Sequence, residues 1–258
     1  MAFNKNELIL DRVRSVVATD ITTKEMLYRM TSIEDPSLNC SAEGEDVTDA
    51  LGSVITTLYR AKNATFSGTN SLISLDLAAA QFGSKKAVAS TDEKIVVPTY
   101  EILTIANGKV TLKHKPVADS IKYIYGLVDG EIATKYVAGA SASKTEFLVG
   151  ENGEITTPTG VTGKVYVEYD YESEKAVKVT NSATKFPEVC GLKIFAYFKD
   201  KCNENLVYSG AVIAERAKIN PESIELALTS TGKHPFEYKI NREYCEEDGD
   251  LFSIIVAE

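Results

Sequence analysis

Short runs of alternating hydrophobic and polar residues follow one another along most of the chain, a pattern typical of half-buried β-strands. Ser223–Thr229 is the most regular of them, because its isoleucine and two leucines occupy alternate positions. Asp200–Asn205 is rich in turn-forming residues and predicts a hairpin between the runs on either side of it. The other predicted strands of this region, rich in β-branched and aromatic residues, are Lys193–Phe198, Asn205–Glu215, Pro235–Ile240 and Leu251–Ala257.

The first part of the chain combines two predicted strands with a polar stretch between them. Lys24–Asp35 is predicted to be a strand that ends at the Asp35-Pro36 pair. The residues that follow, up to Gly52, are polar and acidic, so we expect a long loop with at most a short helical turn. Val54–Gly68 is predicted to be a long strand.

A helix is expected over Ser71–Gly83. The Ser71 hydroxyl can cap its first turn, the alanine run favours helix, and Gly83 suits the left-handed position just past the end. Leu72, Leu75 and Phe82 would then share one face and pack against the sheet. The apolar start of this stretch also allows a strand.

The middle of the chain, residues 93–179, contains about seven short β runs separated by Asn-Gly, Asp-Gly and Thr-Gly turns. Such spacing is typical of an immunoglobulin-like β-sandwich. The alternation in Lys164–Glu172 places Val165, Val167, Tyr169 and Tyr171 on one face. We interpret 93–179 as an inserted domain, with 1–92 and 180–258 forming one discontinuous β domain. The rival interpretation is three consecutive pieces.

The composition of the chain limits the classes of function that it can have. A net charge of −9 over 258 residues does not suit sequence-specific binding of nucleic acid, which needs Lys and Arg to neutralise phosphates. It suits a surface that stays near nucleic acid without adhering to it. The sequence predicts no secretory leader and no membrane span or anchor. The four cysteines have no zinc or disulfide spacing, so we expect reduced thiols, with pairing of some of them left open.

Candidate catalytic and metal-binding residues are few. The two histidines, His114 and His234, are far apart in the sequence and are best interpreted as a solvated strand-end residue and a turn residue. Ser141–Lys144 matches the S-x-x-K pattern of penicillin-recognising acylases, but the companion elements are missing. The carboxylate runs at Glu168–Glu174 and Glu246–Asp250 are expected to be solvated faces, with weak calcium binding at most. We therefore expect no enzyme, no cofactor and no metal site.

Residues 31–52 and 57–84, together with 191–238, resemble the major tail tube proteins of long-tailed bacteriophages. The similarity lies in the order of elements: strands, a long polar loop, a long strand, a helix and a closing set of strands. It implies a mainly β fold, a tail-tube-type β-sandwich or barrel with one packed helix, to which the immunoglobulin-like β-sandwich is added.

The resemblance also implies a function. The chain would be a structural virion protein, made in the host cytoplasm, that assembles with other tail proteins and with itself into stacked rings, which family analogy makes hexameric. DNA would pass through the tube without sequence-specific binding. The polar loop would be the assembly contact, either between stacked rings or between adjacent subunits, unless it is a plain surface loop. Its candidate residues are Asp35, Glu43, Glu45, Asp46 and Asp49.

Other functions stay open at this point. An adhesin or carbohydrate-binding protein would use the inserted sandwich to recognise a glycan. A head decoration or tail terminator would be a different virion part. An enzyme would need one of the motif matches above to be functional.

Overall fold

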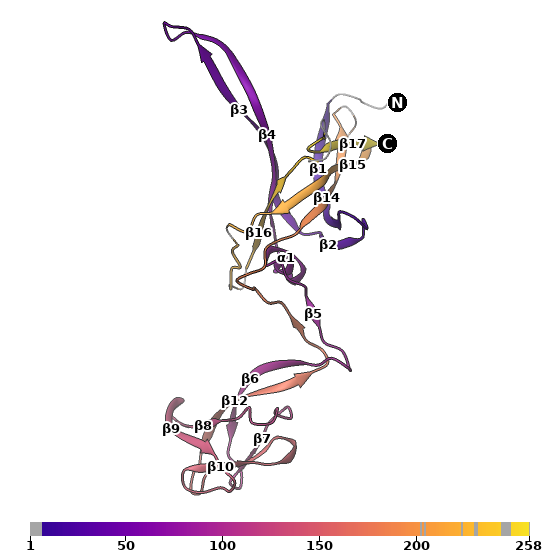
Figure 1. Ribbon diagram of the computed structural model, residues 1–258. Helices are drawn as coiled ribbons and strands as arrows, with labels where there is room; N and C mark the ends of the chain where they lie inside the picture. Colours follow the sequence, from indigo (N-terminus) through magenta and orange to yellow (C-terminus); the bar gives the residue numbers. More distant parts are fainter. Residues whose placement is uncertain are drawn as a thin grey trace. The chain divides into compact units, whose positions relative to one another are not determined.

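The computed structural model describes residues 7–201, 203, 205–222, 224–229, 232–243 and 249–257. The chain divides into two compact units: an outer unit, made of the chain up to Lys86 and from Val179 onward, and an inner unit, Ala87–Lys178 (Figure 1). Each has its own hydrophobic core. The prediction of a mainly β protein with one packed helix is confirmed for the described residues.

The outer unit is built on one eight-stranded, nearly closed sheet with the order β2-β1-β14-β15-β16-β4-β3. All its neighbouring strands are antiparallel, and β17 pairs with the first half of β15, on the same side as β16. Its strands are β1 (Leu8–Asp20), β2 (Met26–Met30), β3 (Ile33–Thr48), β4 (Val54–Asn70), β14 (Val189–Asp200), β15 (Val207–Ile219), β16 (His234–Ile240) and β17 (Ser253–Ala257).

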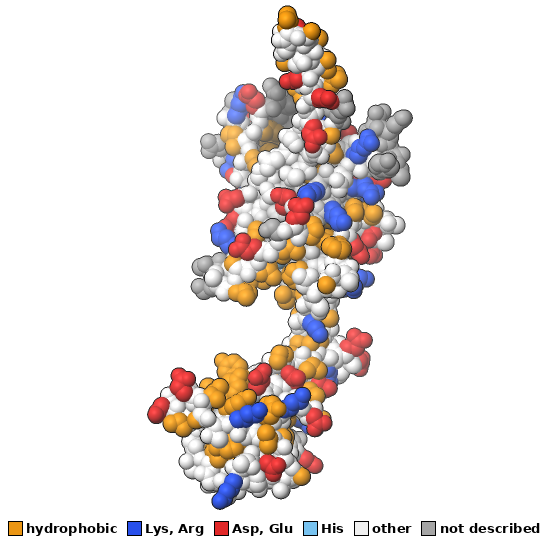
Figure 2. Space-filling model, turned by 60° about the vertical axis from the view of Figure 1, so that its left-hand side comes forward, with side chains coloured by type: hydrophobic (Ala, Val, Ile, Leu, Met, Phe, Trp, Pro, Cys, Tyr) orange, Lys and Arg blue, Asp and Glu red, His pale blue; other side chains and the backbone are white. Residues whose placement is uncertain are grey.

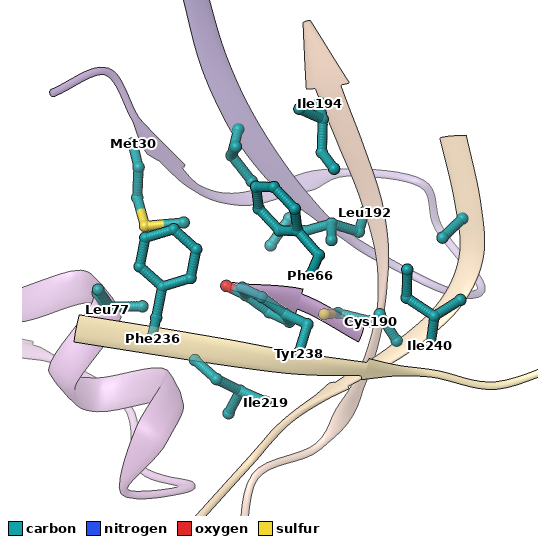
Figure 3. Packing of buried hydrophobic residues seen from close by; sticks show 14 of the residues in the cluster. Met30, Phe66, Leu77, Cys190, Leu192, Ile194, Ile219, Phe236, Tyr238 and Ile240 are labelled. Carbon is teal, nitrogen blue, oxygen red and sulfur yellow. The ribbon is translucent and has the colours of Figure 1, made fainter. Parts of the chain in front are cut away.

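The core of the outer unit lies inside the curled sheet, where side chains from distant strands meet (Figure 3). Phe66 packs against Phe236 with ring centroids 5.8 Å apart, and both lie close to Tyr238. Tyr238 is fully buried and shares a hydrogen bond with the hydroxyl of Tyr28. That bond satisfies two polar groups that would otherwise be costly to bury.

The single α-helix among the described residues, α1 (Leu75–Gln81), is shorter than predicted and turned differently. Ser74, not Ser71, caps it, because the Ser74 side chain accepts a hydrogen bond from the backbone N–H of Leu77. Leu77 is completely buried in the core, whereas Leu72 and Leu75 are exposed. Starting the helix three residues later rotates its apolar face from the predicted leucines to Leu77 and the alanines behind it.

The predicted loop Asp35–Gly52 is wrong for most of its length. These residues form β3, which pairs with β4 almost from end to end and turns back at Asp49–Gly52. Asp35-Pro36 does not end a strand either. Asp35 has a φ of +49° and lies in a register shift within β3, while the break falls at Thr31-Ser32. A polar strand arises here because β4, rich in β-branched residues, supplies the pairing edge.

The predicted strand Ser223–Thr229 is also wrong where the structure describes it, since residues 224–229 form no strand. Leu228, expected to face the core, is 90% exposed. The alternating pattern was not sufficient to form a strand, because no described strand pairs with residues 224–229. The hairpin predicted around Asp200–Asn205 is confirmed by the antiparallel pairing of β14 and β15.

The inner unit has a seven-stranded sheet with the order β6-β12-β8-β9-β10-β11-β7, which packs around a core that includes Ile124, Phe147, Val165 and Val167. The predicted shared face of β12 is confirmed, since Val165, Val167 and Tyr169 are all buried in this core and Tyr171 packs against it. The immunoglobulin-like class of the unit stays a prediction. Its elements are β6 (Ile95–Thr104), β7 (Lys109–Thr111), β8 (Tyr123–Val128), β9 (Glu131–Ala138), β10 (Glu146–Val149), a 3-10 turn (Glu151–Gly153), β11 (Glu154–Thr156) and β12 (Lys164–Ser173).

The chain enters and leaves the inner unit through one short antiparallel ribbon. Its strands are β5 (Ala87–Val88) and β13 (Val177–Lys178), with Val88 opposite Val177. On the outer-unit side, Gly83 has a φ of +62°, and a Cβ placed on it would lie 2.2 Å from the carbonyl oxygen of Phe186. The two connecting segments can approach this closely only because residue 83 has no side chain.

Candidate assembly surface

A long β-hairpin projects from the sheet of the outer unit (Figure 1). β16 pairs with β4 only over Ala64–Asn70, so the stretch of β4 before Ala64 has β3 as its sole described neighbour. We call this hairpin, Cys40–Asn63, the arm. At ~3.3 Å per residue it reaches about 35 Å beyond Ala64. An isolated two-stranded ribbon is only marginally stable in water, so the arm is suited to contact with another sheet.

The arm carries large apolar side chains in solvent. Leu51, in the turn at its tip, is 93% exposed, and Figure 2 shows hydrophobic side chains gathered at that end of the hairpin. Apolar groups concentrated on a thin projection are typical of a protein–protein contact. The exposed members of this set are Val47, Leu51, Val54, Ile55, Leu58 and Tyr59.

Four of the five predicted site residues lie on the arm. Glu43 and Glu45 occupy alternate positions of β3 and therefore point to the same face. Asp46 accepts a hydrogen bond from the Thr57 hydroxyl at 2.6 Å. Asp49 has a structural role in the turn, where it accepts from the backbone N–H groups of Leu51 and Ser53, both at 2.8 Å. Asp35 lies apart from these four, close to the barrel.

A second projecting surface lies at the same end of the outer unit. It consists of the first half of β1, the second half of β14, the first half of β15, and β17, and we call it the flap. Ile9 and Leu10 are 47% and 53% exposed, and Ile254 and Ile255 are 59% and 53% exposed. Successive residues of a strand point to opposite faces. The outer strands of the flap, β1 and β17, are therefore exposed on both faces, whereas Tyr208 in β15 between them is buried.

Several strand edges at this end lack a partner among the described strands. β2 covers β1 only from Val16 to Thr19, which leaves the edge of Leu8–Ser15 bare. β3 pairs with β4 alone, and β17 pairs with β15 alone. Unpaired edges of this length invite pairing with another chain.

The flap also carries cationic groups. The guanidinium carbons of Arg12 and Arg14 lie 5.7 and 5.6 Å from the centre of the Tyr197 ring. Asp11, on the same strand, is held by Lys199 at 2.7 Å. The hydrogen bond from Lys199 lowers the pKa of Asp11. Arg14 forms no ion pair with a described carboxylate, so its charge is available to a partner.

The residues considered for catalysis do not converge. Among the described residues no three His, Cys, Asp or Glu side chains are grouped closely enough to hold a metal ion. Ser141–Lys144 belongs to no helix, unlike the serine of the acylase pattern. Most of Glu246–Asp250 lies outside the described residues, as do Cys202 and Cys245. Cys40 and Cys190 are free thiols, and burial raises the pKa of Cys190 to about 11.

Both histidines have structural contacts that the sequence did not predict. The His114 ring stacks on the Tyr171 ring at 4.1 Å and is only partly exposed. His234 is completely buried. Its Nδ1 accepts from the backbone N–H of Ser74 at 3.3 Å, and its Nε2 lies 2.6 Å from Oε1 of Gln81. Burial lowers the pKa of His234, so the neutral ring links β16 to the start of α1.

A bare-edged sheet with a projecting hairpin and no converging catalytic groups among the described residues fits a protein that works by assembling. The model of the YomU/Tube protein family matches residues 8–252. The chain belongs to this family. Membership of the YomU/Tube family indicates a phage tube-related structural protein and a component of the virion tail. It is consistent with a role other than catalysis.

Two further findings accompany the match to the YomU/Tube family. No curated protein matches the chain. Within the part of the chain that the structure describes, no helix has the length and apolar character needed to span a bilayer.

The sequence located the acidic positions of the arm but missed its form and missed the flap. The signal for the arm was present in Val54–Asn63, since a long β-rich run requires a pairing partner and the nearest chain is the polar stretch before it. The flap gives a weaker signal. Consecutive apolar pairs such as Ile9-Leu10 and Ile254-Ile255 also fit a strand buried on both faces.

Proposed function

We propose that this protein is the building block of a phage tail tube: copies of it form rings, six to a ring by analogy with tail tubes, and the rings stack into a conduit for DNA delivery. Its partners would be other copies of itself and neighbouring tail proteins. The observation that carries the proposal is the set of unpaired strand edges at one end of the outer unit, in a chain that belongs to the YomU/Tube family.

Unpaired edges favour a ring over a closed dimer. The two sides of the sheet end in edges of different kinds. When an edge of one kind on one copy pairs with an edge of the other kind on the next copy, the contact is head-to-tail, and it closes into a ring when the rotation between copies permits. Every copy in such a ring has both edges satisfied. The apolar flap faces and the arm tip would be covered in the same step, which supplies the hydrophobic part of the assembly free energy.

Charge supports the passage of DNA through such a tube. The chain has a net charge of −9, and the arm carries Glu43, Glu45, Asp46 and Asp49. Carboxylates that face a lumen repel phosphates, so DNA would pass without adhering.

Negative-stain electron microscopy of the purified full chain tests the proposal. We expect rings or tubes of uniform diameter to form as the protein concentration rises, and size-exclusion chromatography to show the loss of monomer. Monomers alone, at high concentration and after long incubation, would contradict it.

A second candidate function rests on the inner unit. On one face of its sheet, Tyr166 of β12 lies opposite Tyr125 of β8, and the Tyr100 ring stacks on Tyr166 at 5.4 Å. Tyr123 follows on the same face, with the ammonium of Lys135 3.7 Å from its ring centre. Solvent-facing tyrosines offer both apolar ring surface and hydroxyls, which suits a glycan. The inner unit would then make the protein an adhesin or carbohydrate-binding module.

A glycan array separates the two functions. Full-length protein and the variant Tyr100→Ala/Tyr166→Ala would be compared, since Tyr100 is 62% exposed and its loss leaves the core intact. Binding by the wild type and loss of binding by the variant would support the glycan function. Equal binding by the two proteins, or no binding by either, would contradict the glycan function.

A further inference from the structure

We infer that the outer edge of β3 in the arm of one copy pairs, antiparallel, with the bare edge of Leu8–Ser15 in the β1 strand of the next copy. The inference rests on the proposed function and deepens it, because it names which of the several unpaired edges meet. The occupant of the β1 edge is thus a second copy of this chain.

Strand direction permits this pairing. Each step across the sheet from β1 through β14, β15, β16 and β4 to β3 is antiparallel, so β1 and β3 run in opposite directions. When the next copy takes the same orientation, its β1 runs opposite to the β3 beside it. The antiparallel ladder can therefore continue from copy to copy without inverting a subunit.

The two edges also lie at the same end of the outer unit. Leu8 pairs with Asp200, and Lys199 pairs with Val207, which places the bare half of β1 level with the first half of β15, with β14 between them. The far half of β15 pairs with β16, whose last residue, Ile240, meets Ala64. The arm extends onward from Ala64, toward the same end of the outer unit as the flap (Figure 1).

The lengths of the two edges indicate which stretches of β1 and β3 pair. At ~3.3 Å per residue the bare edge of Leu8–Ser15 is about 26 Å long, and so is the outer part of β3, Ser41–Thr48. β2 covers β1 from Val16 onward and would stop an incoming strand there. The other bare edges fit β3 less well, because β2 and β17 each span only five residues.

Charge complementarity selects β1 over the uncharged edge of β17. β3 presents Glu43 and Glu45 on one face, and Glu43 has no ion-pair partner among the described residues. The β1 edge presents Arg12 and Arg14, held over the Tyr197 ring. Across an antiparallel pair, opposite charges on one face attract and like charges repel.

The test uses two charge-reversed variants of the full chain and their mixture. Arg12→Glu/Arg14→Glu makes both edges acidic, and Glu43→Lys/Glu45→Lys makes both basic. We expect each alone to lose tube assembly, with at least a tenfold rise in the concentration needed. An equimolar mixture should recover assembly, because the acidic β3 of one variant meets the basic β1 of the other. Lys185→Glu/Glu188→Lys, exposed before β14, is the matched control and should assemble normally.

The outcomes separate the two proposals. Absence of rings or tubes from the wild type would contradict the proposed function itself. If the wild type assembles, two results would overturn the β1–β3 pairing and leave the proposed function standing. In the first, the charge-reversed variants also assemble on their own; in the second, their mixture does not recover assembly.

Hydrogen exchange of the wild-type protein tests the pairing independently of whether the variants fold. In the wild type, amides of Leu8–Ser15 and Ser41–Thr48 should exchange at least tenfold more slowly in tubes than in monomers. Unchanged exchange in either stretch would overturn the pairing, whatever the variants do.

Discussion

Single side chains at the start of β16 hold α1 against the sheet. Nδ1 of His234 accepts from Ser74, so its proton lies on Nε2 and is donated to Gln81, whose amide in turn donates to the carbonyl of Pro235 at 3.0 Å. A protonated ring would present an N–H to the N–H of Ser74. The network therefore exists only with a neutral histidine.

We predict an acid-sensitive stability from this network. The pKa of His234 is lowered by burial below its ordinary value of 6.5, so the unfolded state binds the proton more readily. The free energy of unfolding should fall as pH decreases from about 6.5 toward the folded pKa. Urea unfolding at pH 7.5, 6.5 and 5.5 measures it. His234→Gln should be less stable at pH 7.5 but show a flatter dependence; equal slopes would contradict the prediction.

Gly83 gives a second prediction at this scale. Gly83→Ala places a Cβ 2.2 Å from the Phe186 carbonyl at a φ of +62° and should lower the free energy of unfolding by more than 2 kcal/mol, that is, roughly twice the ~1 kcal/mol expected from φ alone. Gly52→Ala is the control, since it has a φ of +84° but no atom within 4 Å. Chemical denaturation of both variants checks the difference, and equal losses would show that the close approach has no cost.

At the scale of elements, the arm should be separable from the fold of the outer unit. The buried core of the outer unit is formed by β1, β2, β14, β15, β16, α1 and the part of β4 from Ala64 onward, and it includes no residue of the arm. Removing Glu43–Arg60 and joining the ends through Asn-Gly should leave the melting temperature within a few degrees, because no core side chain is lost. Assembly, followed by electron microscopy, should disappear. A truncated protein that still forms tubes would show that the arm is dispensable.

Secondary structure was predictable from the sequence where one face of an element meets the core. β12 and β16 correspond to predicted strands, and alternate residues are buried from Val165 to Tyr169 and from His234 to Ile240. β3 was not predictable in this way, because its outer part is exposed on both faces and its polar composition resembles a loop. The start of α1 was predicted wrongly for another reason. Ser71 and Ser74 are equally good caps by residue type, and contacts with residues distant in sequence select the second: the Ser71 hydroxyl donates to Glu34, whereas the backbone N–H of Ser74 donates to His234.

At the scale of the whole molecule, the inner unit should be removable. Its two connecting strands, β5 and β13, pair with each other, so the chain can be rejoined there without stretching. Replacing Ala87–Lys178 with a short Gly-Ser linker should give a protein that folds with one cooperative transition and still assembles. Calorimetry and electron microscopy check both results; a deletion that folds but does not assemble would place ring contacts on the inner unit.

The short ribbon between β5 and β13 has a consequence for how such a chain diversifies. Because Val88 and Val177 face each other across it, whatever is spliced between them needs only adjacent ends. The scaffold can thus accept, lose or exchange the intervening module by recombination, while selection on the assembling part continues unchanged.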